Sequence, residues 1–431
     1  MSGVKNAEEE AIGRGYRGTD RTVCPSHVGD SVLKAAIQDN LSEPTCSYCD
    51  VSGSATEPVA APLDALLEPF MVGVRSLYEP YEESGPPSVS DWLMMGDAEV
   101  TDVVQEVFEL ATIGGDQPPY ELKCDVADAL VVDHWARREW QRLSPSEALW
   151  YSWESFKELV KHETRFFFMT TLEDPDGDER LNPARFFPEL VNVLASNPAI
   201  FPVSCPSPLF RGRMFPTKRT PAEMEQLGTA EQLGSPPESR ASANRMSPAG
   251  ISMFYGATDL ETAIAEIGAH SPDAHAVTGQ FVPMRDIRIV DLTHLPKLPS
   301  IFDPTQRLAY HVAKFLSQFV EDLGQSIVLD GREHIEYVPT QVFTEYLRLS
   351  FPGRVDGLMF KSTQGPGSNV VVFCGPKFCA DKGSEGEFTR LSLDPATVEM
   401  HSVTTVNKPP WWRLLGTCAM SLVRRALEPR V

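Results

Sequence analysis

Hydrophobic residues recur at a spacing of three and four positions through the first half of the chain. The runs from Val32 to Ile37 and from Val100 to Phe108 follow this spacing. Residues spaced in this way share one face of an α-helix, so the runs predict amphipathic helices. The longest helical pattern extends from Ser144 to Phe168 and opens with the capping sequence Ser-Pro-Ser-Glu. We predict a helical N-terminal domain over residues 23–200.

The pattern changes after a proline-rich segment at residues 197–208, because prolines break helices and remove hydrogen-bond donors. Short β-branched or aromatic runs follow, separated by runs with helical spacing. Strands are expected near residues 251–255, 287–292, 358–361 and 370–373, and helices near 258–268, 304–323 and 340–350. The sequence Gly-Pro-Gly-Ser at 365–368 predicts a hairpin loop between the last two strands. The fold class expected for the chain is therefore α+β.

The patterns divide the chain into four segments. Residues 1–22 lack periodic apolar positions and are expected to be a flexible leader. The helical domain occupies residues 23–200 and a mixed α+β domain occupies residues 205–384. Residues 385–431 are expected to be a C-terminal extension, and the sequence leaves its role open.

Charge and hydropathy restrict the partners of the protein. The chain has 38 Lys and Arg against 60 Asp and Glu, which gives a net charge of -22. This charge repels a phosphate backbone, and the sequence contains no basic run that would offset it, so nucleic acid is not an expected partner. The sequence also contains no apolar stretch of the length that a membrane helix needs, and its first residues lack the apolar core of a signal peptide. We therefore expect no membrane contact and a cytoplasmic location.

Two Cys/His pairs near the N-terminus have the spacing of zinc knuckles. They are Cys24-Pro-Ser-His27 and Cys46-Ser-Tyr-Cys49. Three thiolates and one imidazole would fill a tetrahedral shell, which favours a structural zinc ion over a catalytic one that needs an open position. The absence of any metal stays an alternative. The remaining cysteines have no such partners, apart from a loose pair formed by Cys374 and Cys379, and are expected to be buried, inert thiols.

The candidate chemistry lies in a series of motifs between Leu209 and Phe373. They are LFRGR with Arg211, ANRMSPAG with Arg245, FYGA with Tyr255, a helix that carries Glu266, and FKSTQGPGSNVVVF with Ser362. In this order the motifs resemble the RES domain. Asn244 replaces the glycine that relatives often have before the second arginine, and asparagine tolerates the left-handed backbone angles of such a turn.

The helical half carries a second resemblance. Its paired Cys/His motif and the segment WESFKELVKHETRFFF are similar to the HEPN/RES N-terminal domain. Ribonucleases that carry a HEPN domain use an Arg and a His at short spacing. Here the pair is Arg21 and His27, and His27 belongs to the proposed zinc site. We therefore expect no ribonuclease activity.

The resemblance to the RES domain implies a fold like that of ADP-ribosyltransferases of the diphtheria-toxin kind. It implies NAD as the substrate, which relatives consume as phosphorylases, hydrolases or protein ADP-ribosyltransferases. It also implies a toxin or defence effector that a partner protein, an antitoxin, holds in check. The residues expected to be catalytic are Glu266, Tyr255, Arg245 and Ser362, and those expected to bind NAD are Arg211, Arg245, Tyr255, Thr340 and Ser362.

Each of these residues has a chemical reason for its expected role. Cleavage of the nicotinamide–ribose bond passes through a cationic ribose, which a carboxylate such as Glu266 stabilises. Arg211 and Arg245 provide planar forks for the diphosphate, and Tyr255 would stack on nicotinamide or its ribose. Ser362 or Thr340 would provide a hydroxyl, although Thr340 also suits a helix cap. Without the resemblance, a solvated carboxylate, surface arginines and a core tyrosine would explain the same residues.

The sequence thus predicts an enzyme that cleaves NAD, either a glycohydrolase or a phosphorylase. A protein ADP-ribosyltransferase is the alternative, followed by a module that binds NAD or ADP-ribose without catalysis. A zinc-dependent nucleic-acid binder is disfavoured by the charge. The acceptor, the identity of an antitoxin and the assembly into homo-oligomers stay open.

Overall fold

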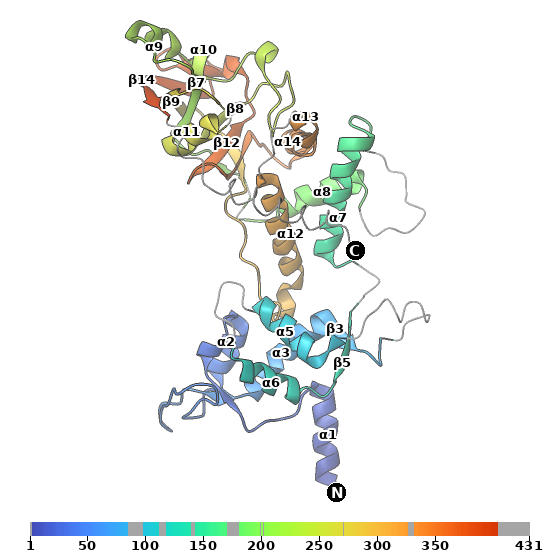
Figure 1. The fold of residues 1–431 in the computed structure, drawn as a ribbon. Helices are drawn as coiled ribbons and strands as arrows, with labels where there is room; N and C mark the ends of the chain where they lie inside the picture. The colour runs from blue at the N-terminus through green and yellow to red at the C-terminus, as the bar shows by residue number, and fades with distance from the viewer. Residues whose placement is uncertain are drawn as a thin grey trace, which may run out of the picture. The chain divides into compact units, whose positions relative to one another are not determined.

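The computed structural model describes residues 2–84, 98–111, 118–138, 143–169, 181–198, 200, 202–269, 271–325 and 332–403. The chain divides into two compact units (Figure 1). The first comprises residues 1–152, 172–181 and 296–318, and the second comprises residues 153–171, 182–295 and 319–431. The described part of each unit has its own hydrophobic core.

The first unit is mainly helical. Its elements are α1 (Ser2–Arg14), β1 (Thr22–Val23), η1 (Pro25–His27), α2 (Ser31–Asp39), β2 (Ala61–Pro62), α3 (Asp64–Leu77), β3 (Tyr78–Pro80), β4 (Ala98–Glu99), α5 (Val100–Ala111), α6 (Tyr120–Ala129), β5 (His134–Arg137) and η4 (Pro304–Gln306). The core centres on Phe70 of α3, whose ring lies 4.6 Å from that of Phe108 and 5.9 Å from that of Phe302. The helices expected from the apolar spacing near residues 32–37 and 100–108 are confirmed as α2 and α5.

Helix α1 lies where the sequence led us to expect a flexible leader. Its stretch from Asn6 to Ile12 consists largely of alanine and glutamate, which favour helices. The helix is followed by Gly15, which has a φ of 88° and whose N–H donates to the carbonyl of Ala11. This left-handed residue is typical of a helix C-terminus. The absence of an amphipathic pattern therefore did not exclude a helix here.

The boundary between the units passes within α7 (Pro145–Glu158) and α12 (Arg307–Gly324). The expected cap of α7 is confirmed, since the Ser144 N–H and hydroxyl donate to the Glu147 carboxylate at 2.9 and 2.6 Å. In the second unit, Trp153 of α7 is fully buried and its ring lies 5.0 Å from that of Phe319. We expected the helical domain to extend over residues 23–200. Residues 153–171 and 182–200 of this range instead belong to the second unit.

The second unit contains the remaining elements. They are η2 (Leu159–Glu163), α8 (Pro183–Ala195), β6 (Val203–Ser204), β7 (Leu209–Phe215), α9 (Pro221–Leu227), α10 (Ala230–Leu233), η3 (Glu238–Arg240), β8 (Phe254–Ala257), α11 (Leu260–Gly268), β9 (His275–Pro283), β10 (Arg288–Asp291), α13 (Glu333–Glu336), α14 (Val338–Ser350), β11 (Gly357–Lys361), β12 (Ser368–Val372), η5 (Pro376–Phe378), β13 (Cys379–Asp381) and β14 (Leu391–Ser402). The mixed α+β content expected for this half is confirmed.

These strands form a sheet with the order β13-β14-β9-β7-β8-β12-β11-β10-β6 among the described residues. The expected hairpin is confirmed, because β11 and β12 pair antiparallel across the Gly-Pro-Gly-Ser loop. The hydrophobic pattern did not predict strands β7, β9 and β14. Strand β14 lies beyond residue 384, where we expected the α+β domain to end, and pairs along β9. The sheet thus extends into the segment expected to be a separate extension, of which residues 404–431 lie outside the described part.

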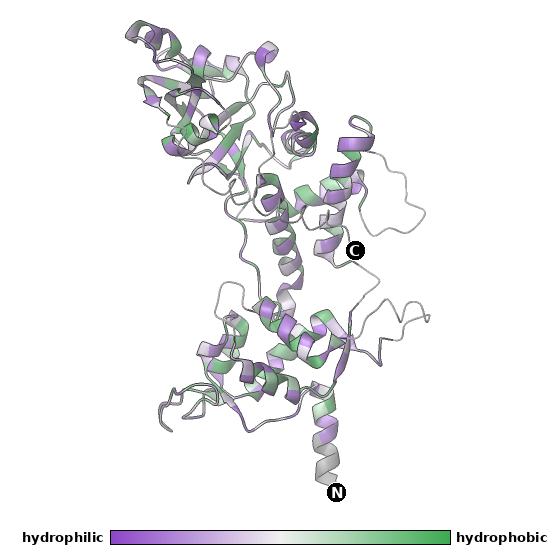
Figure 2. Cartoon of the chain, viewed as in Figure 1, coloured by the Kyte–Doolittle hydropathy of each residue, from purple (hydrophilic) through white to green (hydrophobic). Residues whose placement is uncertain are grey.

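The distribution of hydrophobic residues agrees with this fold. Figure 2 shows hydrophobic and hydrophilic residues side by side along the helices of both units, as expected of helices that bury one face. Within the described residues, no helix is long and apolar enough to cross a membrane.

Gly73 in α3 offers a test of the first core. A Cβ atom at this position would lie 2.4 Å from the ring of Phe302, which is only 2% exposed. Gly73→Ala should therefore lower the free energy of unfolding by about 1–3 kcal/mol, although alanine normally favours helices. Chemical denaturation of the full chain measures this change.

The matched control for this test is Gly13→Ala in α1. A Cβ atom there meets nothing within 4 Å, so this substitution should be neutral or stabilising. Equal stability of the two variants would contradict the packing of Phe302 on α3.

Candidate functional site

The candidate site begins where β7 and β8 separate. The two strands pair at one position, Phe210 opposite Ala257. Because they run antiparallel, Arg211 and Arg213 after that position lie across from Met253 and Tyr255 before it. A cavity of about 220 Å³ lies between these diverging segments.

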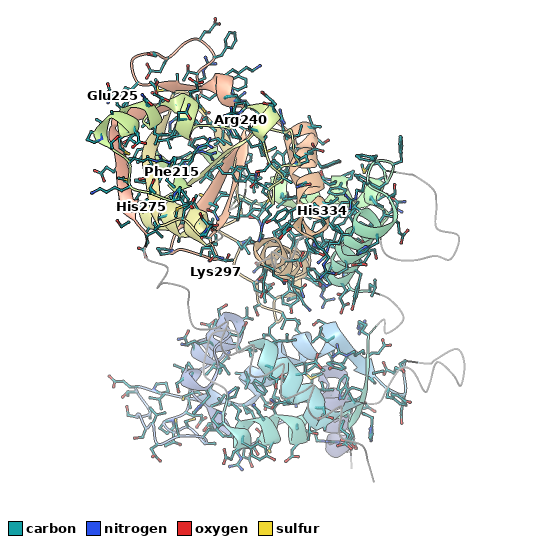
Figure 3. The ribbon with its side chains drawn as sticks, turned by 45° about the horizontal axis from the view of Figure 1, so that its top comes forward. Phe215, Glu225, Arg240, His275, Lys297 and His334 are labelled. Carbon is teal, nitrogen blue, oxygen red and sulfur yellow. The ribbon has the colours of Figure 1, made fainter. Side chains whose placement is uncertain are left out.

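Positive charge dominates the wall of this cavity. Arg211, Arg213 and Arg240 line it together with Ser247, Asn244 and Tyr255 and several apolar residues, and this lining contains no aspartate or glutamate. Figure 3 labels Arg240, which belongs to η3 in the segment between α10 and β8. The cavity is thus suited to an anion in a chain whose net charge is -22.

Arg211 is fixed at the wall of the cavity. Its Nε donates to the carbonyl of Leu233 at 2.7 Å, and its Nη1 donates to the carbonyl of Tyr255. The guanidinium also lies 5.0 Å from the centre of the Phe254 ring. Burial, followed by the charge of Arg213, lowers the pKa of Arg211 to about 10, so the group remains charged at neutral pH.

Tyr255 faces the same cavity. Its hydroxyl lies 2.8 Å from the hydroxyl of Ser247. Burial raises the pKa of Tyr255 to about 12, so its phenol is neutral at physiological pH. The sequence analysis placed Arg211 and Tyr255 in one site, and the structure brings them together here.

The turn before Tyr255 is held by the start of α14. Asn244 and Ser247 exchange backbone hydrogen bonds, at 2.8 and 3.2 Å. The side chain of Gln341 donates to both of their carbonyls, and the hydroxyl of Thr340 donates to the carbonyl of Arg245 at 2.5 Å. Asparagine in place of glycine therefore leaves the turn closed. Thr340, one of the two hydroxyls considered for substrate, supports the backbone of this turn.

Arg245 itself lies outside the lining of the cavity. Its Nη1 and Nη2 donate to the carbonyls of Leu323 and Gln325 at 2.5 and 2.6 Å, at the C-terminal end of α12. Cations are stabilised at this end of a helix, where carbonyls lack partners within the helix. The structure therefore does not bring Arg245 together with Arg211, and its expected contact with the diphosphate stays a prediction.

Glu266 and Ser362 form another part of the site. The Oε1 atom of Glu266 accepts from the Ser362 hydroxyl at 2.5 Å and from the Asn369 amide at 2.6 Å. Ser362 in turn accepts from the N–H groups of Gln364 and Gly365 at 3.0 and 2.9 Å. These bonds fix the carboxylate of Glu266 in one orientation. Ser362, expected to contact ribose or phosphate, thus acts on the carboxylate in this structure.

The two parts of the site meet through the sheet. Asn369 pairs with Ala257, and Val371 pairs with Tyr255. Alternate residues of a strand share a face, so the side chains of Asn369 and Tyr255 lie on the same face of the sheet. Burial lowers the pKa of Arg245, and the charges of Tyr337 and Glu266 oppose this effect.

Close packing at glycines positions the helix that carries Glu266. A Cβ atom on Gly212 would lie 2.9 Å from Ile267 of α11, and one on Gly367 would lie 1.7 Å from Asp259. The N-cap of α11 is Asp259, whose carboxylate accepts from the N–H of Thr262 at 2.8 Å. The capping pattern Thr258-x-x-Glu261 in the sequence predicts Thr258 as the cap, and this prediction is wrong. The hydroxyl of Thr258 accepts instead from the N–H of Ser368 in the hairpin.

The structure brings to the site further residues that the sequence motifs did not indicate. They are Arg213, Arg240, Ser247, Gln341 and Asn369. Arg213 follows Arg211 by two residues, and this spacing places both side chains on one face of a strand. Asn369 directly precedes the three valines of β12, and asparagine is disfavoured in a strand. Both signals were present in the sequence, whereas the position of Arg240 depends on the tertiary fold.

The Cys/His pairs of the first unit also come together. The ligand atoms of Cys24, His27, Cys46 and Cys49 all lie within 4.8 Å of one another. The sulfurs of Cys24 and Cys49 are 3.7 Å apart, close to the roughly 3.8 Å that two Zn–S bonds of about 2.3 Å give in a tetrahedron. The Nε2 atom of His27 is buried and has no hydrogen-bond partner in the described residues. These features fit a zinc ion.

Two of the other cysteines differ from the expected inert thiols. Burial raises the pKa of Cys205 to about 12, as expected of an inert thiol. In contrast, a hydrogen bond between Cys374 and Cys379 lowers the pKa of Cys379 and raises that of Cys374. Cys418 lies outside the described residues.

Comparisons with known proteins agree with these features. The family model of the RES domain matches residues 221–394, and that of HEPN/RES N-terminal domain 1 matches residues 39–174. The second unit thus contains a RES domain. Both resemblances inferred from the sequence are thereby confirmed. Arg211 and Arg213 precede the matched part of the RES domain, whereas Arg240, Tyr255, Glu266 and Ser362 lie within it.

Other comparisons add little to the RES assignment. No curated protein matches the sequence. Among solved structures, the chain is similar to one from the crystal structure of the M. tuberculosis MbcT-MbcA toxin-antitoxin complex. The identity is 12%, the alignment covers 50% of this chain and 92% of that chain, and the TM-score is 0.26. A similarity this weak carries no argument about the RES domain described here.

The support of the turn by α14 can be tested through Thr340. Thr340→Val keeps the shape of the side chain but leaves the carbonyl of Arg245 without its hydroxyl partner. Because an unpaired buried carbonyl costs about 1–3 kcal/mol, the RES domain should lose stability by that amount. Thr340→Ser retains the hydroxyl and serves as the control. Equal denaturation midpoints for the two variants would show that the bond is dispensable.

Proposed function

We propose that the RES domain cleaves the nicotinamide–ribose bond of NAD. The observation that carries this proposal is the carboxylate of Glu266, held by Ser362 and Asn369 on the sheet face that also carries Tyr255. The arginine-lined cavity next to Tyr255 supports it, because NAD joins a diphosphate to the bond that breaks. Membership of the RES family supports the same substrate class.

The reaction assigns a task to each part of the site. The bond between the ribose C1′ and the nicotinamide nitrogen breaks, and nicotinamide leaves with the electron pair. The positive charge that develops on ribose is stabilised by the carboxylate of Glu266. An acceptor then bonds to C1′ and releases its proton. Because Glu266 is already oriented by two donors, little reorganisation opposes this stabilisation.

The acceptor distinguishes the enzymes that this chemistry allows. Water makes the protein a glycohydrolase, inorganic phosphate makes it a phosphorylase, and a side chain makes it a protein ADP-ribosyltransferase. Incubation of the full-length protein with NAD, with and without phosphate, followed by identification of the ribose product, separates them. A module that only binds NAD would release no nicotinamide under any of these conditions.

The finer expectations from the RES resemblance belong to the same proposal. They are a fold like that of ADP-ribosyltransferases and a role as a toxin or defence effector that an antitoxin restrains. Expression of the protein in cells, with measurement of NAD content and growth, tests this role. Growth without loss of NAD would contradict it.

We also propose that Cys24, His27, Cys46 and Cys49 hold a structural zinc ion. The buried, unpartnered Nε2 atom of His27 supports this assignment, as does the separation of the sulfurs. Four protein ligands would leave no open coordination position, so the ion would stabilise the fold and take no part in NAD cleavage. It would join η1 to the loop that carries Cys46 and Cys49.

Glu266→Gln is expected to abolish nicotinamide release. The substitution keeps the size of the side chain and removes its charge, so turnover should fall by about 10²- to 10³-fold or more, while NAD affinity changes much less. Nicotinamide release, NAD binding and circular dichroism measure the three quantities. Glu261→Gln, at an exposed position of the same helix, is the matched control. Turnover within a few-fold of wild type would make Glu266 a bystander.

The zinc proposal predicts about one zinc ion per chain in purified protein, by elemental analysis. Cys46→Ser should lose the ion and lower the unfolding midpoint, because the binding energy of a structural zinc contributes to folding. Cys124→Ser changes a thiol outside the cluster and should retain the ion. Wild-type protein that contains no zinc and is unaffected by chelators would contradict the assignment.

A further inference from the structure

The arginines of the cavity differ in how their guanidinium groups are engaged. Arg211 donates to two backbone carbonyls and is held in place by them. Arg213, two residues further along β7, has a single long contact from Nη2 to the carbonyl of Gly234 at 3.5 Å. Arg240 is exposed at the edge of the same cavity. Arg211 therefore uses its donors within the protein, whereas Arg213 and Arg240 retain donors that a ligand could accept from.

The Nε atom of Arg213 is buried and has no hydrogen-bond partner among the described residues. A buried donor without a partner is costly, and burial of a charged group adds to this cost. Burial and the charge of Arg240 both lower the pKa of Arg213. The protein thus holds two like charges close to each other at the expense of its own stability. An anion between them would satisfy the free donors and relieve the repulsion.

We infer that Arg213 and Arg240 bind the diphosphate of the dinucleotide substrate, a role that was expected of Arg211 and Arg245 from the sequence motifs. The inference rests on the proposed cleavage of NAD. Guanidinium groups bind phosphate oxygens through two parallel hydrogen bonds, and the rest of the cavity offers the neutral side chains of Ser247, Asn244 and Tyr255. Because the lining contains no carboxylate, nothing in it competes for the two arginines.

The position of Arg245 agrees with this inference. Both of its terminal nitrogens donate to carbonyls at the end of α12, so only Nε remains for a ligand. A guanidinium engaged in this way cannot offer a fork to a diphosphate without leaving the helix. Arg245 therefore acts as a positioning residue for the turn from Asn244 to Ser247, and Arg213 and Arg240 supply the charge at the cavity.

The test compares Arg213→Gln and Arg240→Gln with the wild-type full chain, by calorimetric titration with ADP-ribose, which contains the diphosphate and lacks nicotinamide. Each variant should bind ADP-ribose about tenfold or more weakly, since each loses a charge-assisted hydrogen bond. Arg285→Gln, which removes an exposed arginine outside the cavity, is the control for net charge and should bind normally. In NAD cleavage, the two variants should raise KM more than they lower kcat.

The unfolding midpoint provides a second readout. Arg213→Gln removes an unpaired buried charge, so its midpoint without ligand should equal or exceed that of wild type. ADP-ribose should then raise the midpoint of wild type more than that of the variant. A purely structural Arg213 would instead give a less stable variant with unchanged ligand binding, and that outcome would overturn the inference.

The remaining outcomes separate the inference from the function on which it rests. Wild-type protein that binds ADP-ribose through these arginines but releases no nicotinamide would contradict NAD cleavage alone. Variants that bind ADP-ribose as wild type does, in a protein that still cleaves NAD, would contradict the role of the arginines alone. Binding of orthophosphate without binding of ADP-ribose would assign the cavity to a free phosphate and overturn the inference.

Discussion

The site depends on the separation of β7 and β8 in the middle of the sheet. Strands that paired along their full length would satisfy each other's backbone groups and leave no space between them. Here they pair at Phe210 and Ala257 and then diverge. Part of the backbone that this separation leaves open is satisfied by Arg211, which donates to the carbonyls of Tyr255 and Leu233. One side chain thus stabilises the opening and places positive charge at its wall.

The position of the Glu266 carboxylate depends on a different set of contacts. Glu266 projects from α11, whose position is fixed by contact with Gly212 of β7 and with the hairpin glycine Gly367. Its orientation is fixed by Ser362 and Asn369, which belong to the same hairpin. The hairpin therefore determines both where the helix lies and where its carboxylate points. Small residues in this loop serve the site although none of them carries charge.

Local signals explain which parts of this arrangement could be predicted. The cap of α7 and the β11–β12 hairpin follow from neighbouring residues, and both were predicted from the sequence. The cap of α11 was not, because Thr258 and Asp259 are both good caps and the hairpin takes the hydroxyl of Thr258. Strands β9 and β14 were missed because polar residues and glycine interrupt their apolar positions, as Thr278, Gly279 and Gln280 do in β9.

The arginines of the candidate site show the same limit on prediction from the sequence. Arg211 and Arg245 each lie in a recognisable motif and were given the same role from the sequence, but backbone carbonyls from distant elements engage them differently. The carbonyls at the end of α12 occupy Arg245, whereas Arg213 and Arg240 have few partners within the protein. Natural proteins rarely keep a buried donor unpaired unless a ligand or a function compensates for it. In this RES domain the unsatisfied groups, more than the recognisable motifs, therefore indicate where an anion binds.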